Sequence, residues 1–159
     1  MTAAVANRAT VSTPGDRDIH IERLLNAPRG RVWRALNDAD QIAQWWGRGN
    51  KMTIEKHEPW RGGHWRYVEH SDHGDQGFEG RYREVTPEER MVRTFERDGM
   101  PAHVIIETMT LEDLGDGRTK VVIDSLFHTR EERDGMLQSG MEGGMNESFD
   151  ALDRLLAEA

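Results

Sequence analysis

Short stretches in which apolar and polar side chains alternate make up most of the chain. Alternation with a period of two is typical of strands that bury one face. Strands are therefore predicted at residues 19–25, 51–58, 63–69, 77–85, 89–96, 103–112 and 119–127. Turn sequences separate consecutive strands, and residues 114–117 close the last pair as a hairpin. The pattern predicts an antiparallel sheet of six to seven strands.

Helical spacing follows the first strand. Pro28 lies near the first turn of one short helix, where its missing N–H costs nothing. Asp38 is the predicted N-cap of a second short helix, and Gln41 stands three residues later, as in a capping box. Gly47 is the predicted end of that helix. Two short helices are therefore expected between the first and second strands.

A long helix is predicted at the C-terminus. Thr129 and Glu132 have the spacing of a capping box at its start. Apolar side chains then recur at steps of three and four and form one stripe, which consists of Met141, Met145, Phe149, Leu152 and Leu156. Strands grouped apart from helices are typical of an α+β fold.

Four glycines interrupt the first half of this helix, at Gly135, Gly140, Gly143 and Gly144. Each costs about 1 kcal/mol relative to Ala inside a helix. Close approach of the helix to the sheet, or space left for a ligand, would each account for them. The other reading is that the first half of the segment is partly irregular.

Length, composition and charge limit the classes of function. The 159 residues suit one domain, predicted at residues 18–159, preceded by a disordered tail at residues 1–17. The net charge of -8 repels nucleic acids and anionic membrane surfaces. No apolar run reaches the length of about 20 residues that a membrane span needs, and there is no cysteine. We expect a cytoplasmic protein, a monomer or weak homodimer, without nucleic-acid binding or membrane insertion.

Four motifs in order resemble one known family. They are A-P-R-G-R-V-W-R-A-L at residues 27–36 with W-W-G at 45–47, R-G-G-H-W-R-Y at 61–67, F-E-G-R-Y-R-E-V-T-P-E-E-R at 78–90, and S-G-M-E-G-G-M-N-E-S-F-D-A-L-D-R-L at 139–155. The chain resembles the activator of heat-shock-protein-90 ATPase homologue family of the SRPBCC, or START-like, superfamily. Met145 departs from the pattern, since many members carry Trp there, and residues 58–60 depart as well.

This resemblance implies a helix-grip fold, in which a curved antiparallel sheet wraps the C-terminal helix around a cavity. It does not imply one activity, because the superfamily includes ligand carriers and enzymes. Side chains predicted to line the cavity are Trp45, Trp65, Tyr67, Phe78, Tyr82, Phe95, Ile105, Glu107, Met109, Phe127, Met141, Met145 and Phe149. Aromatic and Met side chains line adaptable apolar pockets. The alternative is an ordinary core that these side chains fill.

Glu107 stands out because it shares a face with apolar neighbours. An inward carboxylate is costly unless it is paired or protonated. Glu107 and His103, two weak catalytic candidates, would share that face as an acid–base pair, or Glu107 would anchor a polar group of a ligand. A one-residue bulge that turns Glu107 to solvent is the opposing reading.

The remaining candidate chemistry is weak. His64, His70 and His73 cluster around one turn, but their spacing matches no standard metal site, so a solvated loop is expected. No nucleophile elbow or phosphate-binding loop is present, and no cofactor is predicted. Binding of a small hydrophobic or amphipathic molecule is the preferred function. The alternatives are an enzyme that acts on a metabolite in the cavity and a module that regulates a chaperone.

Overall fold

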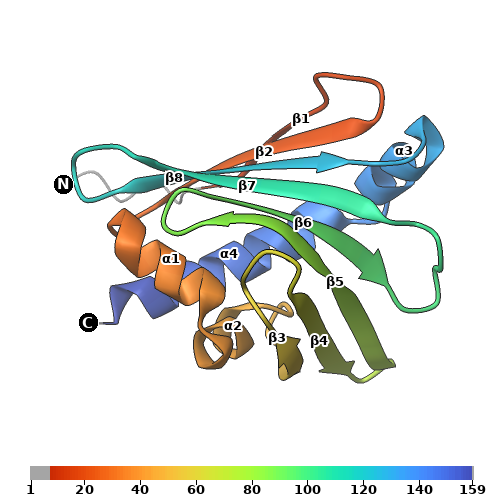
Figure 1. The fold of residues 1–159 in the computed structure, drawn as a ribbon, viewed down its shortest axis with the longest axis horizontal. Coiled ribbons are helices and arrows are strands. Elements are labelled where there is room, and N and C mark those ends of the chain that lie inside the picture. The colour runs from red at the N-terminus through yellow and green to blue at the C-terminus, as the bar shows by residue number, and fades with distance from the viewer. Residues whose placement is uncertain (1–7, 159) are drawn as a thin grey trace.

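One antiparallel sheet of eight strands forms most of the protein in the computed structural model, which describes residues 8–158 (Figure 1). The strands are β1 (Thr10–Ser12), β2 (Asp18–Leu25), β3 (Lys51–His57), β4 (His64–Ser71), β5 (Gly74–Thr86), β6 (Arg90–Arg97), β7 (Ile105–Asp113) and β8 (Thr119–Leu126). Their order in the sheet is β1-β2-β8-β7-β6-β5-β4-β3, and every neighbouring pair is antiparallel. The α+β class is confirmed.

The eighth strand lies in the segment that was predicted to be disordered. Thr10, Val11 and Ser12 pair with Glu22, Ile21 and His20 along the outer edge of β2. Val11 packs against the core, and the pairing satisfies backbone groups that an edge strand leaves open. The strand count is therefore eight rather than six to seven. Residues 1–7 of the predicted tail lie outside the described residues.

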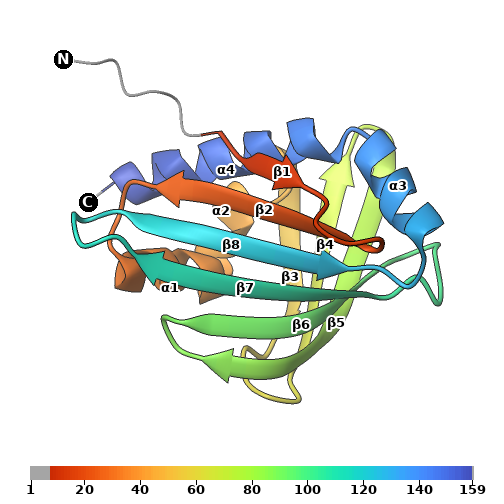
Figure 2. The same ribbon diagram turned by 90° about the horizontal axis from the view of Figure 1, so that it is seen from above.

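Two irregularities let the sheet curve. The register shifts between Ile54 and Lys56 on β3 and between Tyr82 and Glu84 on β5. Extra residues of this kind bend a strand and increase its twist. The curved sheet folds around the C-terminal helix, as the two perpendicular views show (Figures 1 and 2). This arrangement confirms the helix-grip fold.

The two short helices are α1 (Arg29–Asn37) and α2 (Ala39–Trp45). Asp38 caps α2 as predicted, but its side chain accepts from the N–H of Asp40. The predicted capping box is wrong, because the Gln41 side chain accepts instead from Arg31 Nη1 at 2.7 Å. That contact ties α1 to α2.

The predicted long helix is two helices, α3 (Arg130–Gln138) and α4 (Met141–Ala157). Gly140 separates them with a φ of 84°, a left-handed conformation that glycine adopts without steric cost. The capping box of Thr129 and Glu132 is confirmed at the start of α3. The break frees α3 to stand at the end of the sheet, beside the end of β8 (Figure 2).

α3 is anchored by a buried cation in addition to the packing of Met136 against the core. Arg133 is its buried residue, and the guanidinium donates to the carbonyls of Gly15 and Asp18 at 3.0 Å each. Because these carbonyls lie in the β1–β2 connection and at the start of β2, Arg133 ties α3 to this end of the sheet.

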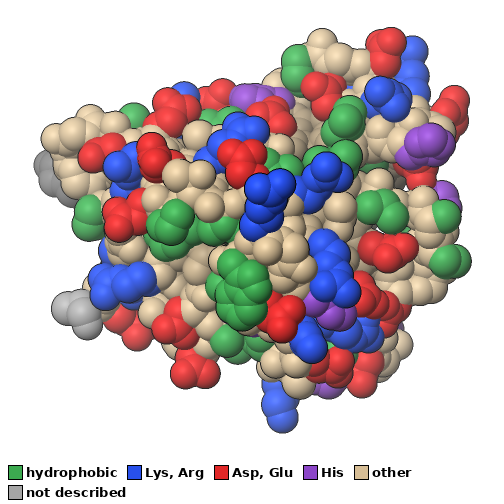
Figure 3. All heavy atoms as spheres, viewed as in Figure 1, with side chains coloured by type: hydrophobic (Ala, Val, Ile, Leu, Met, Phe, Trp, Pro, Cys, Tyr) green, Lys and Arg blue, Asp and Glu red, His purple; other side chains and the backbone are tan. Residues whose placement is uncertain are grey.

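Charged side chains of both signs are interspersed over the face of the molecule in Figure 3. Hydrophobic side chains lie there in small, separate groups. No helix among residues 8–158 combines the length and apolar character needed to cross a membrane.

Candidate functional site

The centre of the predicted cavity is filled by its own side chains. Trp65, Tyr67 and Tyr82 are almost fully buried there. Trp65 packs against Tyr67 and Phe95 with ring centroids 4.8 and 5.6 Å apart, and Phe78 lies 5.6 Å from Phe95. These contacts form a continuous aromatic cluster, so this part of the predicted cavity is packed core.

Trp45 is also buried in the core, but among the described residues it does not belong to this aromatic cluster. Its indole N–H donates to the carbonyl of Ala35 on α1 at 2.8 Å. The adjacent Trp46 takes its place, with its ring 4.9 Å from Phe78 and 5.5 Å from Tyr67. The reason is local, since α2 ends at Trp45 and Trp46 has extended backbone, which redirects its side chain.

Four further predicted residues, Met109, Met141, Met145 and Phe149, belong to or pack against the hydrophobic core. None of them lines either pocket described below in the part of the chain that the structure covers. Gly144 allows close approach at this point, because a Cβ there would lie 2.7 Å from Cδ of Arg48. The close neighbour of Gly144 is thus a flexible side chain from the connection between α2 and β3, and not the sheet.

A pocket of about 420 Å³ lies at the end of the sheet, between the sheet and α3. Three of the residues named from the strand pattern line it, namely Phe95 on β6, Ile105 on β7 and Phe127 directly after β8. Met100 and Val104 from the β6–β7 connection and Met136 from α3 add apolar surface that the strand pattern did not identify. The remaining lining residues are Arg97, His103, His128, Glu131, Glu132, Gly135 and Ser139.

Space in this pocket depends on one of the helix glycines. A Cβ on Gly135 would meet no atom within 4 Å, so the glycine faces open space. The equivalent position on α4, Gly143, also faces open space but does not line the pocket. Gly135 thus lines the pocket without narrowing it.

One polar contact joins the two walls of the pocket. His103 Nδ1, in the β6–β7 connection, hydrogen-bonds to Oε1 of Glu132 on α3. The other oxygen of Glu132 accepts from the N–H of Thr129 at 3.1 Å in the capping box. Burial opposes the charge of Glu132, but the contacts with His103 and Thr129 outweigh it and hold the pKa of this carboxyl below its ordinary value.

Glu107 faces inward, and no bulge turns it to solvent. Register is continuous along β7, and Glu107 lies directly across from Arg93 on β6. Arg93 Nε donates to Glu107 Oε1 at 2.9 Å. His103 lies before β7 and pairs with Glu132, so the predicted acid–base pair of His103 and Glu107 is not formed.

Arg93 is the functional candidate that the sequence reasoning missed. Its side chain is 9% exposed, and the guanidinium carbon lies 4.1 Å from the centroid of a Trp65 ring. Burial opposes the charge, but the carboxylate of Glu107 outweighs it and raises the pKa of Arg93 above its ordinary value. The sequence pattern could have revealed it, because Arg93 lies between Met91 and Phe95 at a position of the strand where the alternation predicts an inward side chain.

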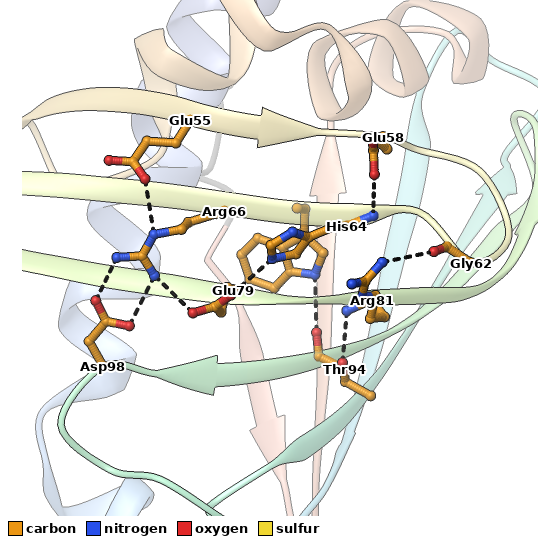
Figure 4. A network of polar contacts seen from close by, with 10 residues as sticks. Glu55, Glu58, Gly62, His64, Arg66, Glu79, Arg81, Thr94 and Asp98 are labelled. Atoms are coloured by element: carbon orange, nitrogen blue, oxygen red, sulfur yellow. Dashed lines mark hydrogen bonds and ion pairs between the residues drawn. The ribbon is translucent and has the colours of Figure 1, made fainter.

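The histidines around the β4–β5 turn do not form a metal site. His64 contacts Glu79 on the outer face of the sheet, where Arg66 also binds Glu55, Glu79 and Asp98 (Figure 4). His70 contacts Asp75 at 2.8 Å. No group of three metal-ligating side chains occurs within the described part of the chain.

A second, polar pocket of about 310 Å³ lies near this turn. Arg48, Asn50, Ser71, Asp72, His73 and Glu147 line it. Arg48 and Asn50 both donate to the buried carboxylate of Glu69, at 3.2 and 2.7 Å. Arg48 therefore already has a carboxylate partner, and we assign the pocket no ligand.

The family described as "Activator of Hsp90 ATPase homolog 1-like protein" matches residues 26–157. The chain belongs to this family. The match begins just after β2 and runs through the last residue of α4, so it includes α3 and the whole pocket. The comparison with curated proteins gives no match.

Solved structures of bacterial proteins share the fold of this family member. A protein from Rhodobacter sphaeroides is 26% identical, with a TM-score of 0.86 over 94% of this chain and 98% of that one. A protein from Arthrobacter aurescens is also 26% identical, with a TM-score of 0.84 over 94% and 92% of the two chains. A Mycobacterium smegmatis protein, at 19% identity and a TM-score of 0.85 over 95% and 98%, supports the fold alone.

Proposed function

We propose that this protein binds a small hydrophobic or amphipathic molecule in the pocket between α3 and the end of the sheet. The observation that carries the proposal is the apolar lining of a space of about 420 Å³, supplied by Phe95, Ile105, Phe127 and Met136 among others. Small-molecule sites typically have a few hundred Å³ of largely apolar surface with a few polar groups.

The chemistry around the pocket favours binding over catalysis. Glu107 forms an ion pair with Arg93 through one carboxylate oxygen, and His103 is hydrogen-bonded to Glu132 in the helix cap, so the two candidate residues do not face each other. An acid–base mechanism needs titratable groups within reach of one reacting atom. An interaction with a chaperone rests on the family description alone. The cytoplasmic location stays a prediction.

The proposal is tested by thermal unfolding with a panel of lipids, aromatic metabolites and polyketide-like compounds. A ligand present at about 100 times its Kd stabilises the folded state by about 2.7 kcal/mol. For a domain of this size, that corresponds to a rise in Tm of about 5–10 °C. We expect a rise for one or more apolar classes.

A matched pair of variants locates the site. Gly135→Leu places a side chain in the pocket, whereas Gly143→Leu places the same side chain in open space on α4. Both replace a helix glycine with a better helix former, so both are expected to fold. The ligand-induced rise should disappear in Gly135→Leu and persist in Gly143→Leu. Equal rises in both variants, or no rise with any compound, would contradict the proposal.

A further inference from the structure

A row of polar side chains crosses the inner face of the sheet beside the pocket floor. Tyr82 on β5, Arg93 on β6, Glu107 on β7 and Ser125 on β8 are successive cross-strand partners. We call these four residues the polar row. Residues two positions along these strands, Phe95, Ile105 and Phe127, line the pocket. Two residues of a strand span about 7 Å, so the row lies about 7 Å further into the sheet than these lining residues, and none of its four members itself lines the pocket.

Hydrogen-bonding capacity in the polar row is only partly used. Arg93 donates through Nε to Glu107, and its guanidinium lies close to the hydroxyl groups of Tyr67 and Tyr82. Tyr82 Oη is buried without a hydrogen-bond partner in the described chain. Buried polar groups normally have partners, so an orphaned hydroxyl of this kind calls for an explanation. A ligand atom at the row would supply one.

Solvent reaches part of the row. The Glu107 side chain is 20% exposed although it lies on the inner face of the sheet. One carboxylate oxygen is held by Arg93, which leaves the other available to accept a hydrogen bond. A group that enters past Phe95 and Ile105 would therefore meet an open acceptor and nearby donors.

The charge balance of the row selects the class of group it can bind. Arg93 and Glu107 neutralise each other, so a charged group that entered would be desolvated without a counter-ion of its own. A hydroxyl or carbonyl carries no such cost. A hydroxyl can donate to Glu107 and accept from Arg93 or Ser125.

We propose that the polar row binds the neutral oxygen of a hydroxyl or carbonyl group on a ligand whose apolar body occupies the pocket. This inference rests on the proposed function and adds the chemical class of the ligand. It predicts discrimination among compounds that share one apolar skeleton and differ in a single group.

The test compares binding of naphthalene, 2-naphthol and 2-naphthoate by isothermal titration calorimetry at neutral pH. The three share an aromatic body, while the added group is absent, neutral or charged. A net hydrogen bond corresponds to about a fivefold change in affinity, so two would give 2-naphthol an advantage of roughly tenfold or more over naphthalene. 2-Naphthoate should bind more weakly than 2-naphthol.

Variants assign the preference to the row. In Arg93→Met/Glu107→Leu, the buried ion pair is replaced by apolar side chains of similar size, a change that proteins often tolerate. This double variant should bind naphthalene as before and lose the preference for 2-naphthol. Tyr82→Phe and Ser125→Ala remove single hydroxyl groups, and each should reduce the preference in part even if the double variant fails to fold. Thr108→Ala, on β7 beside Glu107, is the control and should keep it.

The outcomes separate the inference from the proposed function. If naphthalene and 2-naphthol bind equally well to the wild-type protein, or if 2-naphthoate binds most tightly, the polar row does not select a neutral oxygen, although the pocket still binds ligands. A preference that survives in all three row variants also overturns the inference. If none of the three compounds binds and the wider panel gives no rise in Tm, the proposed function fails and the inference fails with it.

Discussion

The buried pair of Arg93 and Glu107 makes the strongest quantitative prediction for this fold. Glu107→Gln would remove the carboxylate and leave the guanidinium, now 9% exposed, without its counter-charge. Loss of one partner of a buried ion pair typically costs 3–5 kcal/mol. Glu107 itself is one-fifth exposed, so water compensates in part and we expect about 3 kcal/mol. For a domain of this size, that lowers Tm by about 6–12 °C.

A second Arg–Glu pair on the same sheet provides the control. Arg90 on β6 contacts Glu84 on β5 at 3.2 Å, but both side chains are nearly half exposed. Exposed pairs contribute about 0–1 kcal/mol, so Glu84→Gln should cost less than about 0.5 kcal/mol.

Urea unfolding followed by tryptophan fluorescence measures both variants, and Trp65 reports directly because Arg93 lies over its ring. The double variant Arg93→Met/Glu107→Leu should lie within about 1 kcal/mol of the wild-type protein. If Glu107→Gln costs no more than Glu84→Gln, Arg93 is not held as a buried cation, and the reasoning about the polar row is refuted.

Three further predictions concern the sheet, its outer face and the pocket wall. Gly80→Ala should strongly destabilise the fold in urea unfolding, because a Cβ there would lie 1.9 Å from the carbonyl oxygen of Thr94. A decrease of less than about 1 kcal/mol in the free energy of unfolding would be too small for a backbone clash and would contradict this. The carboxylates of Glu22 and Asp124 raise the pKa of the His20 imidazole above its ordinary value. The stabilisation that protonated His20 gives the folded state is therefore complete below about pH 6.5 and is lost as the pH rises through the raised pKa. The free energy of unfolding should therefore fall across that range, and His20→Gln should flatten the fall; an unchanged slope would contradict this. Glu132→Gln should keep the capping box and hardly change the free energy of unfolding, whereas Glu132→Ala should lower it by about 1 kcal/mol in the same assay. Equal decreases for the two variants would argue against the capping box.

The fold could be predicted because its signals are local. Alternation located the strands of the sheet, and the spacing of Thr129 and Glu132 located the start of α3. The errors lie where tertiary contacts override local pattern. Residues 10–12 become a strand only because β2 offers an edge, and the helix break at Gly140 follows from one left-handed residue among four similar glycines.

The candidate site was harder to predict than the fold. The alternation along the strands indicated that Phe95, Ile105 and Phe127 face inward, and they do. Alternation alone cannot show whether an inward side chain is packed in the core or borders an open pocket. Trp65, Tyr67 and Tyr82 have the same phase and fill the core. Met100 and Val104 lie in a connection without periodicity, so no sequence pattern marked them as part of a pocket.

Methyl NMR of the protein labelled at its methionines tests the central claim most directly. Met100 and Met136 line the pocket, whereas Met141 and Met145 pack against the core along α4. An aromatic ligand shifts the resonances of methyl groups beside its ring, and 2-naphthol is a suitable probe. Our account predicts that the signals of Met100 and Met136 move on titration while those of Met141 and Met145 stay in place. Movement of Met141 and Met145 with unchanged Met100 and Met136 would place the ligand between α4 and the sheet and contradict the account.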